Sequence, residues 1–198
     1  MKKIALIICA ALVAIAPAGY ASPNSDNEWV TLLGTSGGFE NFTTVGEANW
    51  VVSEQGVEAQ DKRQKYAFLV TKDVYEDFEL HVEFWVSDDA NSGLFLRCQD
   101  PQNPKASNCY EANIFDQRPD QTYASGSIVG VAPVPTPKPK TGNRWNTYDI
   151  TVVGPRLILK LNGETTVDVE DTQFGQGPIG LQWGEGTVRI REVKIKPL

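Results

Sequence analysis

Hydrophobic and polar positions alternate along residues 77–87. The apolar row is Phe78, Leu80, Val82, Phe84 and Val86, and the positions between them are Glu79, His81, Glu83 and Trp85. Successive side chains of a β-strand point to opposite faces of its sheet, so this period of two predicts a strand with one buried and one solvent-facing side. Helical periodicity is almost absent from the chain.

Further segments with strand character predict more strands, at residues 29–33, 50–52, 56–60, 66–70, 92–98, 109–115, 145–153, 156–161, 179–183 and 187–195. Turn signals separate them, and Asn162-Gly163 is the strongest, because this dipeptide favours a type I′ hairpin. The proline-rich residues 132–140 cannot form a central strand and are expected to form a stiff surface loop. Many short strands at this spacing predict an all-β fold, a sandwich or a jelly roll.

The first residues have the layout of a secretory signal peptide. Lys2 and Lys3 precede an apolar run over residues 4–16, and small residues follow Pro17. The run is too short to span a bilayer comfortably. We expect cleavage after Ala21, with Ala18 as the alternative, which leaves one domain over residues 22–198 and places it in the periplasm or outside the cell.

Charge and cysteine content narrow the function further. The 198 residues carry a net charge of −7, the wrong sign for binding a phosphate backbone, so we expect no nucleic-acid partner. Cys98 and Cys109 remain after the signal peptide, and an oxidising compartment favours a disulfide between them, with two free thiols as the alternative. His81 is the single histidine, which argues against a metal site built from Cys and His.

The polar positions suggest a binding face. If the apolar row of residues 77–87 faces the core, Glu79, His81, Glu83 and Trp85 face outward, and the same parity can place Glu111 and Asn113 on one face. Carboxylates, amides and exposed indoles suit a sugar, because aromatic rings pack on its C–H groups and charged groups bind its hydroxyls. An ordinary solvated sheet face is the alternative. The chain lacks a phosphate-binding glycine loop, and Ser-His-Asp catalysis would have to rest on the single His81.

An ordered set of motifs resembles one family. The runs YEDFELHVEF at residues 75–84 and ANSGLFLR at 90–97 are similar to the core of the 3-keto-disaccharide hydrolase family. Its later segments resemble CYEANIFD at 109–116, RWNTYDI at 144–150, LNG at 161–163, GLQ at 180–182 and VRIREVKIKPL at 188–198. The resemblance extends from about residue 39 to the end of the chain.

This resemblance implies a concanavalin-like jelly roll whose concave sheet handles oxidised oligosaccharides. Family members are associated with cleavage of 3-keto-glycosides, by elimination to a 3-keto-2-hydroxyglucal and its hydration. The chemistry is reasonable, because a ketone at C3 acidifies the proton on C2, which a base can remove while the C1 substituent leaves. Such a site needs a base, an acid for the leaving oxygen and a cation or donor for the enolate.

The resemblance also suggests roles for individual residues. Glu83 and Glu111 are candidates for base and acid, and Arg97 for the clamp on the enolate or a hydroxyl. Asn91 and Asp116 would position the substrate or hold a divalent metal through oxygen ligands. His81, Trp85 and Trp183 are further candidates for contact with the sugar.

One position departs from the family pattern. Trp183 follows Gln182 where many members carry a histidine. Loss of that histidine leaves a carboxylate as the base, or leaves a protein without activity. Three interpretations therefore stay open: a 3-keto-glycoside lyase or hydrolase, a non-catalytic carbohydrate-binding module, and a structural domain of the cell envelope.

Overall fold

The computed structural model describes residues 28–60 and 66–198. The expected signal peptide and its cleavage site at Ala21 lie outside this part of the chain. Within the described residues, no helix is both long and apolar enough to cross a membrane.

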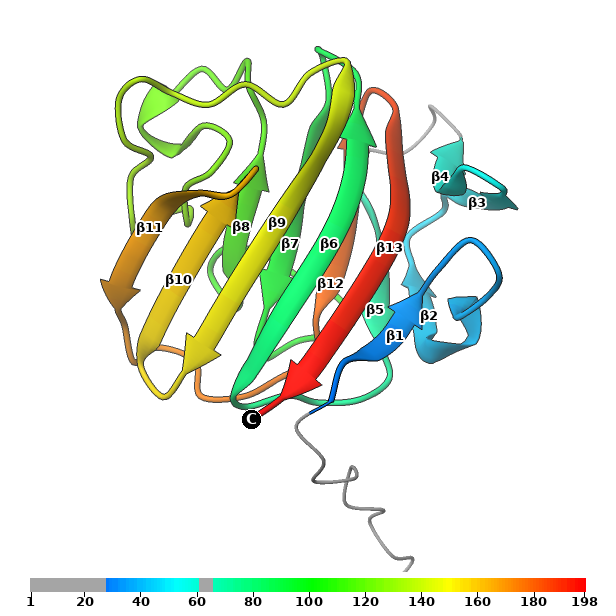
Figure 1. Ribbon diagram of the computed structural model, residues 1–198, viewed down its shortest axis with the longest axis horizontal. Coiled ribbons are helices and arrows are strands. Elements are labelled where there is room, and N and C mark those ends of the chain that lie inside the picture. Colours follow the sequence, from blue (N-terminus) through cyan, green and yellow to red (C-terminus); the bar gives the residue numbers. More distant parts are fainter. Residues whose placement is uncertain (1–27, 61–65) are drawn as a thin grey trace, which may run out of the picture.

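Two antiparallel sheets stack face to face (Figure 1). The eight-stranded sheet contains β1 (Val30–Leu33), β3 (Asn49–Ser53), β4 (Gly56–Gln60), β6 (Phe78–Val86), β9 (Arg144–Val153), β10 (Arg156–Leu161), β11 (Glu164–Glu170) and β13 (Val188–Pro197). The five-stranded sheet contains β2 (Phe42–Val45), β5 (Ala67–Thr71), β7 (Asn91–Leu96), β8 (Tyr110–Ile114) and β12 (Gly180–Glu185). Two short 3₁₀ helices, η1 (Phe39–Asn41) and η2 (Gln121–Tyr123), lie in the connections.

The strand order matches a jelly-roll sandwich. The large sheet runs β11-β10-β9-β6-β13-β4-β3, with β1 also paired to β13, and the small sheet runs β2-β5-β12-β7-β8. Neighbours in the small sheet are distant in sequence, because the chain crosses repeatedly between the two layers. The prediction of an all-β jelly-roll sandwich is confirmed.

The core lies between the two sheets and follows from the period of two. The apolar row of β6, from Phe78 to Val86, is buried there. Leu69 of β5, Leu94 of β7 and Leu181 of β12 enter the same core from the small sheet. Each core residue of the small sheet therefore directs its chain neighbours to the opposite, outer face of that sheet.

The hairpin prediction at Asn162-Gly163 is confirmed, since both residues have positive φ angles, 53° and 82°. Two strands, β2 and β11, were not predicted from the sequence. β11 is an edge strand of sequence ETTVDVE, and this polar composition hides its period.

Candidate functional site

Two rows of side chains cross the outer face of the five-stranded sheet. The strand register gives the first row as Phe68, Gln182, Gly93 and Asn113, and the second as Val70, Gly180, Phe95 and Glu111. The rings of Phe68 and Phe95 meet edge to face, with centroids 5.2 Å apart. This face therefore combines an aromatic pair with two amides and a carboxylate.

Two glycines lie among the aromatic and polar side chains of this face. A Cβ on Gly93 would lie 3.4 Å from Cγ of Glu111 and 3.3 Å from the carbonyl oxygen of Ala112. A Cβ on Gly180 would lie 3.4 Å from Cβ of Phe95. Because neither glycine carries a side chain, Glu111 and Phe95 can pack close to the sheet at these two positions.

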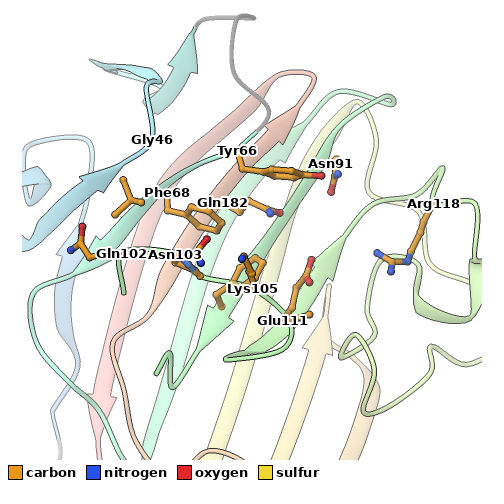
Figure 2. Close-up of a pocket in the computed structure, with 14 residues that line it drawn as sticks. Gly46, Tyr66, Phe68, Asn91, Gln102, Asn103, Lys105, Glu111, Arg118 and Gln182 are labelled. Carbon is orange, nitrogen blue, oxygen red and sulfur yellow. The ribbon is translucent and has the colours of Figure 1, made fainter. Parts of the chain in front are cut away.

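A cavity of about 490 Å³ opens on this face, and Phe68, Phe95, Glu111 and Gln182 line it (Figure 2). Its wall includes residues 102–106 of the loop between β7 and β8, together with Tyr66, Asn91 and Arg118. A disulfide between Cys98 and Cys109 joins the two ends of this loop, so the predicted pairing is confirmed. The crosslink closes the loop whose residues 102–106 border the cavity.

Glu111 is the one carboxylate among the described residues that line the cavity. Its residue is 9% exposed, and no donor in the described part of the chain is hydrogen-bonded to its carboxylate. Burial raises the pKa of Glu111 to about 7, and the positive charge of Arg118 opposes that rise. Glu111 therefore exchanges its proton near neutral pH.

Two further polar groups face the cavity without a protein partner. The Gln182 side chain is 6% exposed, and its Oε1 accepts no hydrogen bond from residues 28–60 or 66–198. Nε of Arg118 is also buried without an acceptor among those residues. Figure 2 shows the guanidinium of Arg118 directed toward Glu111 from the loop that follows β8. Buried polar groups usually have partners, so unpaired ones beside a cavity mark a ligand site.

Of the residues proposed from the sequence, Asn91 and Glu111 line this cavity. Trp183 does not, because it follows Gln182 on β12 and therefore points into the core. It is 4% exposed, and its indole Nε1 donates to the carbonyl oxygen of Gly186 over 2.9 Å. The departure from the family histidine thus falls on a core position in this chain.

Arg97 lies away from the cavity. Its φ of 51° breaks the alternation of β7 and turns the side chain toward the end of the sandwich. There it is 2% exposed and donates to the carbonyl oxygens of Glu76, Gly154 and Phe174 and to the Asp77 carboxylate at 2.6–3.1 Å. Through these hydrogen bonds Arg97 fixes three loops in place, so its role is structural.

Asp116 is likewise a structural residue. Its Oδ1 accepts from the hydroxyls of Ser125 and Thr141, and its Oδ2 accepts from the backbone N–H groups of Thr141 and Gly142. The residue is 4% exposed and does not line the cavity. It ties together the two ends of the long connection between β8 and β9, which contains the proline-rich segment.

Glu83, His81 and Trp85 lie on the outer face of the eight-stranded sheet, on the opposite side of the sandwich. Glu83 pairs with Arg191 at 2.7 Å, and His81 with Asp149 at 2.6 Å. The guanidinium of Arg189 lies 4.8 Å from the ring centroid of Trp85. These are cross-strand pairs on a solvated sheet face.

The expectation that Glu83, Arg97 and Glu111 share one face is therefore wrong. The alternation along a strand divides its side chains between two faces of the sheet. It does not tell which faces of two different sheets lie on the same side of the molecule. Parity from the core residue Leu181 could have identified Gln182. Arg118 sits in an irregular loop, where no period signals its position.

Asn91 and Asp116, which were candidates either for positioning the substrate or for holding a divalent metal, do not form a suitable donor set for a metal here. Hydrogen bonds within the protein occupy the Asp116 carboxylate, as described above. Among the described residues, no group of three or more His, Cys, Asp or Glu side chains could hold a metal ion. The residues present thus do not fit a metal held by protein side chains.

Comparison with known proteins agrees with this architecture. Residues 28–196 match the family described as 3-keto-alpha-glucoside-1,2-lyase-like domain. No curated protein matches the chain.

Solved structures share the fold. A candidate glycosyl hydrolase of Parabacteroides distasonis has a TM-score of 0.68 and 24% identity, covering 87% of this chain and 100% of that one. A second from the same organism has a TM-score of 0.73 and 15% identity, covering 86% and 94%. The carbohydrate-binding module CBM66 of Bacillus subtilis has a TM-score of 0.62 and 17% identity, covering 79% and 95%.

Proposed function

Because this chain belongs to the family of 3-keto-alpha-glucoside-1,2-lyase-like domains, we propose that it cleaves 3-keto-glycosides by removing the C2 proton and expelling the C1 substituent. The observation that carries this proposal is the Glu111 carboxyl, which lies in the cavity, has no hydrogen bond to any described residue, and has a pKa raised to about 7. A general base works best when its pKa is near the operating pH. The similarity of the fold to a carbohydrate-binding module supports a sugar as the ligand.

Glu111 acts as the base. The ketone at C3 acidifies the C2–H bond, and the electrons of that bond pass into an enolate as the carboxylate takes the proton. The Phe68 and Phe95 rings offer an apolar wall for the C–H face of the sugar. The wall also keeps water from the carboxylate, which maintains its basicity.

Arg118 takes the role that the sequence analysis gave to Arg97. Its guanidinium lies beside the cavity, unpaired at Nε and close enough to Glu111 to lower the pKa of that carboxyl. A fixed cation stabilises the negative charge that develops on the enolate oxygen, and it does so more strongly away from bulk water.

Expulsion of the C1 oxygen completes the elimination. The enolate electrons form the C1–C2 double bond as the C1–O bond breaks. The proton that Glu111 accepted from C2 passes to the leaving oxygen, so the products are an alcohol and a 3-keto-2-hydroxyglucal, and no external proton is consumed. Later addition of water to the glucal would complete a net hydrolysis.

We also propose that the domain acts outside the cytoplasm, in the periplasm or after secretion. The signal-peptide layout of the first 21 residues and the Cys98–Cys109 disulfide support this location. Disulfides persist in oxidising compartments and are rare in the cytosol.

The test is turnover of 3-keto-cellobiose and 3-keto-trehalose by the purified protein, with the glucal followed by mass spectrometry. Glu111→Gln keeps the shape of the side chain but cannot carry the proton, so kcat should fall about 10²- to 10⁴-fold. Glu83→Gln, on the opposite sheet face, is the matched control and should retain wild-type turnover. Full activity of Glu111→Gln would refute the assignment, and sugar binding without turnover in the wild type would identify a non-catalytic binding module.

A further inference from the structure

The Gln182 amide is the most deeply buried unpaired group beside the cavity. Its residue is 6% exposed, and Oε1 has no hydrogen-bond partner in the described part of the chain. A buried acceptor without a donor lowers the stability of the folded protein. A donor supplied by a ligand would remove this cost, so the unpaired oxygen indicates which kind of ligand group belongs beside it.

Gly93 separates Gln182 from Glu111. Gln182 pairs directly with Gly93 across β12 and β7, and Cγ of Glu111 lies 3.4 Å from the place a Cβ of Gly93 would occupy. The amide and the carboxyl therefore line the same cavity close to Gly93. A ligand atom in the cavity between them has the carboxyl on one side and the amide on the other.

We propose that Gln182 is a specificity-determining residue that accepts a hydrogen bond from the C2 hydroxyl of the sugar. This inference rests on the proposed function, in which Glu111 attacks the proton on C2. The C2 carbon then lies in the cavity between the two side chains, with its hydrogen toward Glu111 and its hydroxyl toward Gln182. The C3 ketone cannot occupy the position beside Oε1, because it has no hydrogen to donate.

The bond to Gln182 should strengthen during the reaction. As C2 becomes part of the C1–C2 double bond, its hydroxyl changes from an alcohol to an enol, which is a better donor. An interaction that is stronger in the transition state than in the bound substrate raises kcat as well as affinity. Gln182 thus positions C2 for Glu111 and favours 2-hydroxy over 2-deoxy substrates.

The test compares a 3-keto-glucoside with its 2-deoxy analogue in the wild type and in Gln182→Met. The analogue still has a C2 proton and can still eliminate, so both substrates report on the same chemistry. Methionine has a similar length but lacks the amide oxygen. We expect Gln182→Met to lower kcat/KM for the 2-hydroxy substrate about 10- to 100-fold and to leave the 2-deoxy substrate nearly unchanged.

A stability measurement separates this role from a structural one. Replacing an unpaired buried amide by an apolar group should leave the melting temperature unchanged or raise it. Gln55→Met, in the exposed turn between β3 and β4, is the matched control and should alter neither the substrate ratio nor the melting temperature. An equal loss with both substrates, or a large drop in the melting temperature of Gln182→Met, would overturn the proposal.

Binding of a compound that cannot react keeps this test independent of turnover. The 3-keto derivative of 1,5-anhydroglucitol has no leaving group at C1, and its 2-deoxy counterpart lacks the C2 hydroxyl. Calorimetry should show that the wild type prefers the 2-hydroxy compound and that Gln182→Met does not. A preference that survives in Gln182→Met contradicts the role of Gln182, whereas binding with this preference but without turnover contradicts the catalytic proposal alone.

Discussion

The buried carboxyl of Glu111 should make the stability of the protein depend on pH. Its pKa rises from an ordinary value of 4.5 to about 7 in the folded state, chiefly because burial disfavours the charged form. In the unfolded chain the carboxyl is solvated and returns to its ordinary value. The folded state therefore binds more protons than the unfolded state between these two pKa values.

The size and sign of the effect follow from this difference. A group whose pKa is higher in the folded state stabilises the protein fully at pH values below its pKa in the unfolded state. That contribution is lost as the pH rises through its pKa in the folded state. Each pKa unit corresponds to about 1.4 kcal/mol, so the shift amounts to about 3 kcal/mol. For a chain of this length, that equals about 6 to 12 °C in melting temperature. Most of the loss should occur between pH 5 and pH 8.

Glu111→Gln isolates this contribution, because a glutamine is neutral at every pH. Urea unfolding of the wild type and of Glu111→Gln at pH 5, 6, 7 and 8 should show the variant gaining stability over the wild type as the pH rises. Glu164→Gln, at the exposed first position of β11, is the control and should follow the wild type. Parallel curves for the wild type and Glu111→Gln would refute the argument from burial, and with it the basis for a base that titrates near neutral pH.

Three structural assignments make further predictions. Arg97→Met should lower the free energy of unfolding in urea by about 3 to 5 kcal/mol, since it leaves carbonyls and a carboxylate unpaired; a loss of turnover without this destabilisation would contradict the structural role. Replacing Cys98 and Cys109 by serine should lower it by about 3 kcal/mol, and should also increase proteolysis of the loop beside the cavity, measured by limited digestion. Asp116→Asn should cost about 1 to 3 kcal/mol and increase amide exchange at Thr141, whereas unchanged exchange would contradict the anchoring role.

The sequence predicted the layers well because burial acts on each strand separately. The alternation of β6 and the Asn162-Gly163 turn depend on local geometry, and both appear in the structure as expected. β11 escaped prediction because an edge strand with a mostly exposed surface does not need an apolar row. Its pairing comes from the hairpin that connects it to β10.

The site was harder to predict because it depends on how two sheets and two loops are placed together. Parity correctly identified Glu111 as an outward-facing residue of β8, but it treated the outer faces of the two sheets as equivalent, which brought in Glu83 from the wrong side. The position of Arg97 was predicted wrongly because its own φ angle is positive. Sequence periodicity does not reveal a positive φ. Arg118 reaches the cavity from a loop, and only the three-dimensional arrangement reveals it.

The two outer faces of the sandwich differ in whether their polar groups are paired, and this difference supports the choice of site. On the eight-stranded sheet, Glu83 has Arg191 and His81 has Asp149, so the protein itself satisfies these charges. On the five-stranded sheet, the Glu111 carboxyl and Oε1 of Gln182 border the cavity and have no such partner within residues 28–60 and 66–198. Selection for stability alone would replace them by apolar residues, because unpaired buried groups cost folding free energy. The presence of both side chains beside the cavity is explained if a substrate donates a hydrogen bond to Gln182 and a proton to Glu111.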